Sequence, residues 1–171
     1  MTVDLQTLEV GTELPTLTTA AISRTTLALF AGGSGDHNPI HLDIDVAKSA
    51  GMDDVFAQGM LSMAYLGRLL TDWVPQERIR SFEVRFAAIT PLYATPTCAG
   101  RIAAVHDVDG ERRATVDVTV TLSDGTVTLS GTAVYSVLAE EWPAVRAGLE
   151  ARLASYGARP VLFRTADGLR A

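Results

Sequence analysis

The sequence has 171 residues, of which 47% are hydrophobic, and this is enough for one domain with a buried core. Its 14 basic and 20 acidic side chains give a net charge of -6 without a basic block, which argues against nucleic acid or an anionic membrane surface as the main partner. The single cysteine excludes an intramolecular disulfide, and neither a signal-peptide pattern nor a membrane-spanning apolar run is present, so we expect a cytoplasmic protein.

The first third of the chain predicts short elements separated by turns. Weak alternation indicates a short strand near residues 17–20. A helix is expected to begin after Ser23, a plausible N-cap, and to end at the pair Gly32 and Gly33. A second, shorter helix is expected over residues 43–50, where an aspartate can cap its start.

The middle of the chain changes from a helical period to a period of two. Residues 59–73 are apolar almost all round, which predicts a helix enclosed by other structure. Residues 78–139 alternate between apolar and polar side chains and predict an antiparallel meander of about four strands. Asp-Gly pairs at 109–110 and 124–125 have the chemistry of hairpin turns, because glycine accepts a positive φ.

These elements predict an α+β fold in which the sheet wraps around the helix over residues 59–73. A sheet with one apolar face and an almost wholly apolar helix can bury each other's surfaces. We expect this domain to occupy residues 1–139. Residues 140–171 would form an extension, with an added amphipathic C-terminal helix indicated by apolar side chains at helical spacing over 141–156.

The loop that joins the first two helices carries the strongest candidate for chemistry. Asp36 and His41 lie five positions apart, and the glycines before them and Pro39 between them prevent an α-helix. The turn could bring both side chains to one side, where a carboxylate and an imidazole would supply an acid and a base. The same residues also make a good turn without any catalytic role.

Other chemistries fit the sequence less well. His37 and His41 are four apart, but Pro39 prevents the shared helical face of a two-histidine zinc site, and the acidic residues lack the spacing of a calcium loop. Cys98 lies in a strand-like stretch, where a buried small hydrophobe is the usual role. The glycines at 32–35 do not follow a strand, which excludes the dinucleotide-binding pattern. We therefore expect no metal.

A resemblance to a known family adds to this interpretation. The sequence FAGGSGDHNPIH at residues 30–41 resembles the hydratase-2 signature of the MaoC-like hotdog family, and so do later positions: Ala47, Gly51, Phe56-Ala57 and Gly59-Met60-Leu61. The similarity is dense over residues 24–75 and looser to about 139, and it is strongest to actinobacterial (3R)-hydroxyacyl-ACP dehydratase B subunits. It implies a single hotdog fold at 1–139, with two such domains pairing into one continuous sheet.

The resemblance also implies a set of site residues. Asp36 and His41 match the catalytic pair of the family. Gly59, Asn38 and Ser62 are the expected oxyanion and substrate-binding residues: the Gly59 N–H would donate to the thioester carbonyl, and Asn38 would shape the loop. The reaction needs no cofactor. The sequence does not assign which of Asp36 and His41 is the acid and which the base.

The implied function is reversible hydration of trans-2-enoyl thioesters, or dehydration of (3R)-hydroxyacyl thioesters, carried on CoA or acyl carrier protein. The expected assembly is a homodimer or a heterodimer with another hotdog subunit. The alternative is a non-catalytic or partner-dependent subunit of a heteromeric dehydratase. Arg85 and Arg101 are candidate contacts for the phosphates of the thioester carrier. The sequence departs from the family at Gln58, where histidine is common, and at 91–96, which lacks a Gly-Asp pair.

Overall fold

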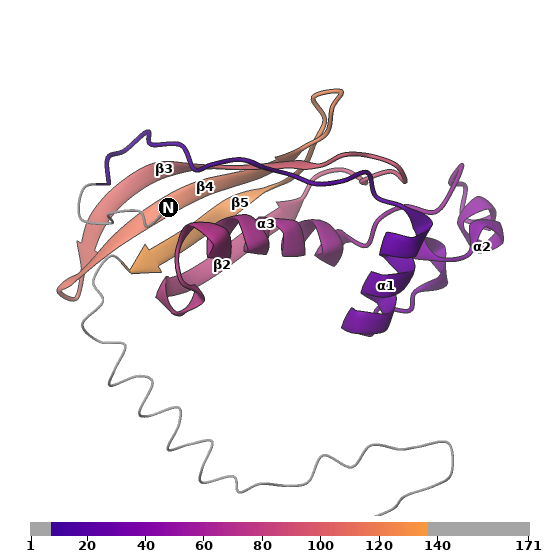
Figure 1. The fold of residues 1–171 in the computed structure, drawn as a ribbon, viewed down its shortest axis with the longest axis horizontal. Coiled ribbons are helices and arrows are strands. Elements are labelled where there is room, and N and C mark those ends of the chain that lie inside the picture. The colour runs from indigo at the N-terminus through magenta and orange to yellow at the C-terminus, as the bar shows by residue number, and fades with distance from the viewer. Residues whose placement is uncertain (1–7, 137–171) are drawn as a thin grey trace, which may run out of the picture. The chain divides into compact units, whose positions relative to one another are not determined.

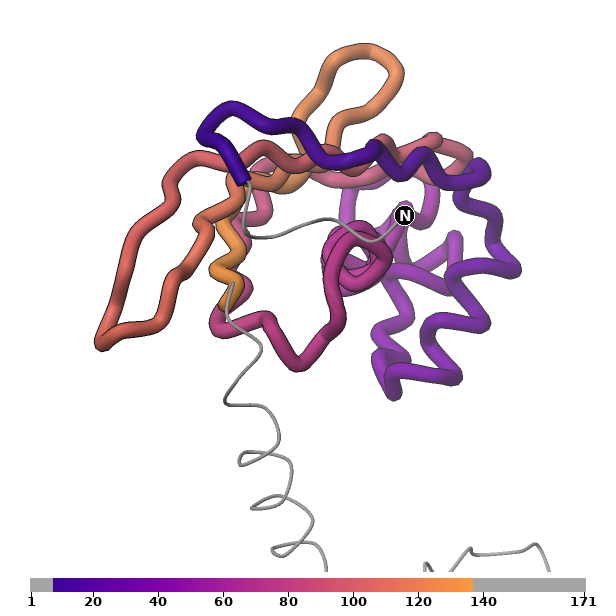
Figure 2. The backbone as a smooth tube through the Cα atoms, turned by 60° about the vertical axis from the view of Figure 1, so that its left-hand side comes forward, coloured from indigo at the N-terminus to yellow at the C-terminus, as the bar shows by residue number. Residues whose placement is uncertain are grey.

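A curved antiparallel sheet packed against one long helix forms the described part of the chain. The structure is a computed structural model that describes residues 8–136. Five strands lie in the order β1-β3-β4-β5-β2, and helix α3 (Gly59–Trp73) runs across one face of them (Figure 1). Figure 2 shows α3 nearly end-on, with the sheet curving around it. The expected α+β arrangement is confirmed.

The strands match the regions where the sequence has a period of two. Their bounds are Leu17–Thr18 for β1, Ile79–Phe86 for β2, Thr97–Val108 for β3, Glu111–Thr121 for β4 and Val127–Ser136 for β5. Both predicted hairpin turns are present: Gly110 has φ +82° between β3 and β4, and Gly125 has φ +87° between β4 and β5. Only glycine adopts such angles without strain, so these two turns were readable from the sequence alone.

The prediction of a simple meander is wrong for β2. This strand does not pair with β3, its successor in the chain, but with β5, from Ile79 opposite Tyr135 to Phe86 opposite Leu129. Residues 87–96 between β2 and β3 are too long for a tight hairpin and contain two prolines, so they carry the chain across to the other side of the sheet. As a result β2 is an edge strand with one partner among the described strands.

Helix α1 (Arg24–Ser34) begins as predicted but ends later. Ser23 caps it, with its hydroxyl accepting the Thr26 N–H at 3.1 Å. The helix continues through Gly32 and Gly33 and stops only at Gly35, whose φ of +77° closes it in a left-handed cap. A glycine inside a helix costs about 1 kcal/mol, which is too little to stop one, whereas a left-handed residue ends it.

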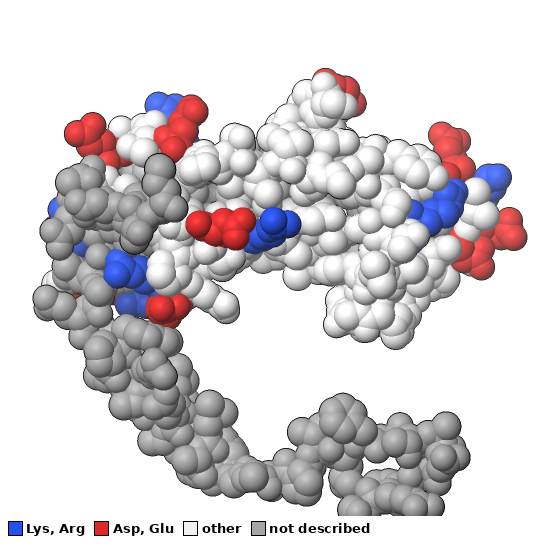
Figure 3. All heavy atoms as spheres, in the orientation of Figure 1, with Lys and Arg blue, Asp and Glu red and all other residues white. Residues whose placement is uncertain are grey.

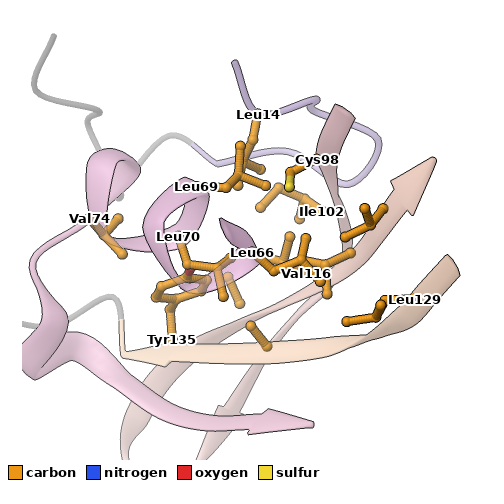
Figure 4. Close-up of a cluster of buried hydrophobic side chains, with 14 of the residues drawn as sticks. Leu14, Leu66, Leu69, Leu70, Val74, Cys98, Ile102, Val116, Leu129 and Tyr135 are labelled. Atoms are coloured by element: carbon orange, nitrogen blue, oxygen red, sulfur yellow. The ribbon is translucent and has the colours of Figure 1, made fainter. Parts of the chain in front are cut away.

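Two hydrophobic cores hold the molecule together. The larger core lies between α3 and the sheet and includes Leu66, Leu70 and Tyr135 (Figure 4). Cys98 also lies in this core, where burial raises the pKa of its thiol to about 11, in agreement with its expected role as a buried small hydrophobe. The smaller core packs α1 and helix α2 (Ile44–Ser49) against the start of α3, through Ile22, Leu27, Ala47, Val55, Ala57 and Leu61.

The sheet covers one face of α3, as the expected wrapping of the sheet around this helix requires, and the opposite face is not covered within residues 8–136. Leu61, Leu66, Leu69 and Leu70 are buried, but Met60 is 54% exposed. No helix among residues 8–136 is long and apolar enough to cross a membrane. The C-terminal helix expected over 141–156 lies outside the described residues.

A buried ion-pair group joins β4 to β2 at the end of the sheet remote from α1. Glu111 is 8% exposed; one carboxylate oxygen accepts hydrogen bonds from Arg80 at 2.9 and 2.5 Å, and the other accepts one from Arg113 at 2.6 Å. The hydrogen bonds, of which the one from Arg80 has the largest effect, lower the pKa of Glu111 from 4.5 to about 2. The charged form is therefore favoured by folding.

We expect this pair group to make the free energy of unfolding depend on pH. Because the folded pKa lies below the unfolded one, the contribution is complete above pH 4.5 and is lost as the pH falls from 4.5 toward 2. Allowing for solvent around the arginines, its size is roughly 1–2 kcal/mol. Urea unfolding at a series of pH values should give a smaller acid-induced loss for Glu111→Gln than for the parent protein. Equal losses would contradict this account.

Candidate active site

The loop between α1 and α2 is held by a series of side-chain to backbone hydrogen bonds, each spanning two residues. The Ser34 hydroxyl accepts the Asp36 N–H at 3.2 Å, Asp36 Oδ1 accepts the Asn38 N–H at 3.3 Å, and Asn38 Oδ1 accepts the Ile40 N–H at 3.2 Å. Asn38 thereby caps the short 3₁₀ turn η2 (Pro39–His41). Short polar side chains make such turns locally, so the loop has a defined shape without a regular element.

His41 is fixed through one of its two ring nitrogens. It is 9% exposed, its Nδ1 lies 2.9 Å from the Phe56 carbonyl oxygen, and its ring meets the Phe56 ring edge-on with centroids 4.8 Å apart. A carbonyl only accepts, so Nδ1 carries the proton and donates it. In the neutral imidazole, Nε2 is then the nitrogen with a free lone pair. His41 can exchange a proton with a ligand through Nε2.

Helix α3 begins at Gly59 with its first turn uncapped by a side chain. Gln58 occupies the N-cap position but makes no capping hydrogen bond. The N-terminal N–H groups of a helix and its dipole together favour negative charge. A Cβ built at Gly59 would lie 3.0 Å from the Phe86 ring, so glycine allows β2 to bring this ring against the helix start.

A mostly apolar cavity of about 330 Å³ opens beside this helix start. Its wall includes a buried hydroxyl pair, Ser62 and Thr90, with their oxygens 3.2 Å apart. The lining residues come from the start of α3, the end of β2 and the crossing segment after it: Phe56, Ala57, Gly59, Ser62, Phe86, Ala87, Ala88, Ile89, Thr90 and Leu129. The cavity therefore offers apolar walls, two hydroxyls and a helix N-terminus.

The predicted site residues fall into three groups. Gly59 and Ser62 line the cavity, and His41 reaches its edge through the carbonyl of Phe56, a lining residue. Asp36 and Asn38 lie on the neighbouring loop and are not among the lining residues of the described chain.

The two arginines lie elsewhere. Arg85 is exposed on β2, on the face opposite Val84 and Phe86, which turn toward α3. Arg101 on β3 directs its guanidinium group to the Gly11 carbonyl, 3.4 Å away. It lines a separate hollow that shares no residue with the cavity at Gly59.

Sequence reasoning missed two residues that shape this site, Thr90 and Phe86, and noted Gln58 only as a departure from the family. Gln58 is fully buried, and its amide Nε2 donates to the Leu27 carbonyl of α1 at 3.2 Å. The available signal was weak, since a polar residue just before a helix is usually a solvent-exposed cap. Among residues 8–136, no group of three His, Cys, Asp or Glu side chains could hold a metal ion.

Comparison with known proteins places this architecture in a family. A model described as a MaoC like domain matches residues 6–126. No curated protein matches the chain. The R-hydratase PhaJ1 from Pseudomonas aeruginosa superposes with a TM-score of 0.69 at 25% identity, covering 79% of this chain and 86% of its own.

Two further solved structures are similar. The ChsH1-ChsH2 complex from Mycobacterium tuberculosis gives a TM-score of 0.66 at 27% identity, over 75% of this chain and 97% of that one. The (R)-hydratase from A. caviae involved in PHA biosynthesis gives 0.67 at 24% identity, over 75% and 96%, and this likeness bears on the fold alone.

The sheet wrapped around α3 is thus a hotdog fold of the hydratase and dehydratase class. The chain belongs to the MaoC-like family, as the signature at residues 30–41 indicates.

Proposed function

We propose that this protein is an (R)-specific hydratase of trans-2-enoyl thioesters and, in reverse, a dehydratase of (3R)-hydroxyacyl thioesters carried on CoA or acyl carrier protein. Asp36 and His41 are the proposed proton-transfer pair. The observation that carries the proposal is the fixed tautomer of His41: its Nδ1–H is engaged by the Phe56 carbonyl at 2.9 Å, which leaves Nε2 as a proton acceptor.

In hydration, one water molecule adds across the C2=C3 double bond. Asp36 and His41 hold the water; its oxygen bonds to C3 as one of the pair takes its proton, and the other member, which starts protonated, gives its proton to C2. Dehydration reverses each step, so the C2–H and C3–O bonds break and water leaves. His41 takes part through Nε2 only. Such positioned acid-base groups typically contribute a factor of 10²–10⁴ in rate.

The thioester carbonyl gains negative charge when C2 becomes enolate-like, and the start of α3 is the proposed place for it. The Gly59 N–H and the dipole of a 15-residue helix favour an anionic oxygen there. The cavity beside Gly59, with its apolar walls, would receive the acyl chain, and the Ser62 and Thr90 hydroxyls would lie along it. Asn38 serves this site by capping the turn that carries His41.

A second hotdog subunit would complete the site. In the view of Figure 3, charged side chains of the described chain lie toward both ends, and an acidic and a basic side chain also lie in the middle, where α3 runs. On α3 itself, Arg68 and Asp72 form an exposed ion pair. Exposed apolar side chains lie at the cavity, with Phe86 49% and Ile89 47% exposed. Edge strand β2 leaves backbone groups available for pairing with another chain. Homodimers and heterodimers both fit these features.

The direct test is turnover by the purified full chain of a series of enoyl-CoA substrates from crotonyl-CoA upward. We expect the absorbance of the conjugated enoyl thioester to fall and the product to be the (3R)-hydroxyacyl thioester. No turnover at any chain length, alone or with a co-expressed hotdog partner, would contradict the proposal. The mass in solution is measured on the same sample.

The second candidate function is a subunit that needs a different hotdog partner. The edge of β2 that has no partner strand among residues 8–136 favours it, and one similar structure is the two-component ChsH1-ChsH2 complex. Turnover that appears only with a second chain, and survives Asp36→Asn and His41→Ala in this one, would establish a non-catalytic role. Loss of that turnover would instead identify this chain as the catalytic subunit.

A further inference from the structure

Gln58 is a buried amide that is only half satisfied. Its side chain has 0% exposure, Nε2 donates to the Leu27 carbonyl at 3.2 Å, and Oε1 has no hydrogen-bond partner among the described residues. Its surroundings are apolar, since Leu27, Ala57 and Leu61 all belong to the smaller core. A buried oxygen without a donor destabilises the folded state, so an apolar side chain of the same shape would suit this place better for packing alone.

Three consecutive residues just before α3 each bind a different part of the molecule. The Phe56 carbonyl accepts from His41, the Ala57 N–H donates to the Thr90 carbonyl at 3.0 Å, and the Gln58 amide donates to Leu27 in α1. The first bond fixes the proposed proton-transfer histidine, and the second fixes the crossing segment that lines the cavity. The third is made by a side chain and can be removed without changing the backbone.

The bond from Gln58 joins two elements of the proposed site. One leads into the loop with the proton-transfer residue Asp36, and the other begins at Gly59, the proposed place for the anionic oxygen. Helix α1 ends at Ser34, and its cap Gly35 leads directly into the loop with Asp36, while Gln58 directly precedes Gly59. A second bond between the same two regions, the Arg24 to Asp54 pair at 2.6 Å, lies on the surface with both side chains more than one third exposed. An exposed ion pair constrains geometry weakly, whereas the buried amide is held on all sides.

We propose that Gln58 is a positioning residue, whose amide sets the first turn of α3, and with it the Gly59 N–H, relative to the loop of Asp36 and His41. This inference rests on the proposed hydratase function. The amide that supplies the donor Nε2 also buries Oε1 without a partner in the described chain, and this oxygen lowers the stability of the folded state. Gln58 therefore stabilises the geometry for turnover while it lowers the stability of the fold.

The test is Gln58→Met in the full chain, because methionine has nearly the same shape and removes both the donor and the unpartnered oxygen. We expect an unchanged or higher melting temperature, a kcat about tenfold lower, and a KM within about twofold, since Gln58 does not line the cavity. Hydrogen exchange of the peptide covering residues 57–66 should become faster even though the whole protein is no less stable.

Two control variants separate this effect from general ones. Tyr135→Phe removes another buried oxygen that has no hydrogen-bond partner among residues 8–136, in the larger core, and should raise or keep the melting temperature with unchanged kcat. Arg24→Gln breaks the exposed bond between the same two regions and should leave kcat and the exchange of 57–66 unchanged.

Each outcome decides the inference. Unchanged kcat and unchanged hydrogen exchange of residues 57–66 in Gln58→Met would overturn the inference, because an apolar side chain would then position the start of α3 equally well. A melting temperature that falls together with kcat would also overturn it, in favour of a purely structural role. If the parent protein turns over no enoyl thioester, the proposed function fails by itself, and the exchange of 57–66 at unchanged stability still decides whether Gln58 positions the helix start.

Discussion

Asp36→Asn is expected to lower kcat for enoyl-CoA hydration by about 10³, within the range that positioned acid-base groups contribute. Asparagine keeps an oxygen that can accept the Asn38 N–H, so the loop should keep its shape while the carboxyl group that takes or gives a proton is lost. His41→Ala should have an effect of similar size. The double variant should be little worse than either single one, because the two side chains act on the same water. Steady-state kinetics with crotonyl-CoA measure all three.

His37→Ala is the matched control for these variants. His37 is exposed in the same loop, and its bond to Gly35 is made by its backbone N–H, not by its imidazole. Its kcat should stay within about twofold of the parent value, as for other surface substitutions. A melting temperature close to the parent's in Asp36→Asn excludes unfolding as the cause of its defect. Near-normal turnover by His41→Ala would exclude His41 from the proposed mechanism.

Gly131→Ala is expected to destabilise the protein by roughly 3 kcal/mol or more, enough to prevent folding in many domains of this size. Gly131 on β5 lies between Val84 of β2 and Val118 of β4. A Cβ at this position would lie 2.0 Å from the Glu83 carbonyl oxygen and 2.8 Å from the Val84 Cα. Both atoms belong to the backbone, so β2 has to move away. Urea unfolding, or the yield of folded protein, measures the loss.

Gly67→Ala provides the contrast at a site with space. Gly67 lies inside α3, and the nearest atom to its added Cβ, on the Phe82 ring, is 4.0 Å away. Alanine in a helix interior is favoured over glycine by about 0.5–1 kcal/mol, so this variant should unfold at a higher urea concentration than the parent. Equal stability of the two alanine variants would contradict the assigned role of the β2 to β5 contact.

Local chemistry explains why much of this fold could be predicted. The turns at 109–110 and 124–125 depend on glycine angles, and helix α3 begins and ends where its apolar run does, at Gly59 and Trp73. The loop at 36–41 was predictable because its hydrogen bonds span only two residues. The pairing of β2 with β5 was not, because it depends on which sheet edge is free once β3, β4 and β5 have assembled.

The same distinction applies to the candidate site. The loop and the helix start were recognisable because each is a short motif of special residue types. Thr90 and Phe86 were not, since they meet α3 only through the long-range register of β2. The burial of Gln58 depends on α1 packing beside it, and nothing in its immediate neighbours indicates that. Whether an amide side chain points into the core depends on the tertiary packing around it.

The pairing of β2 with β5 also constrains the order in which the chain folds. Strands β3, β4 and β5 are successive and joined by tight turns, so they can form early from local contacts. Strand β2 precedes them in the chain but must close a long loop to reach β5. Until it docks, β5 has an unpaired edge that can recruit another chain. We expect aggregation during refolding to begin there.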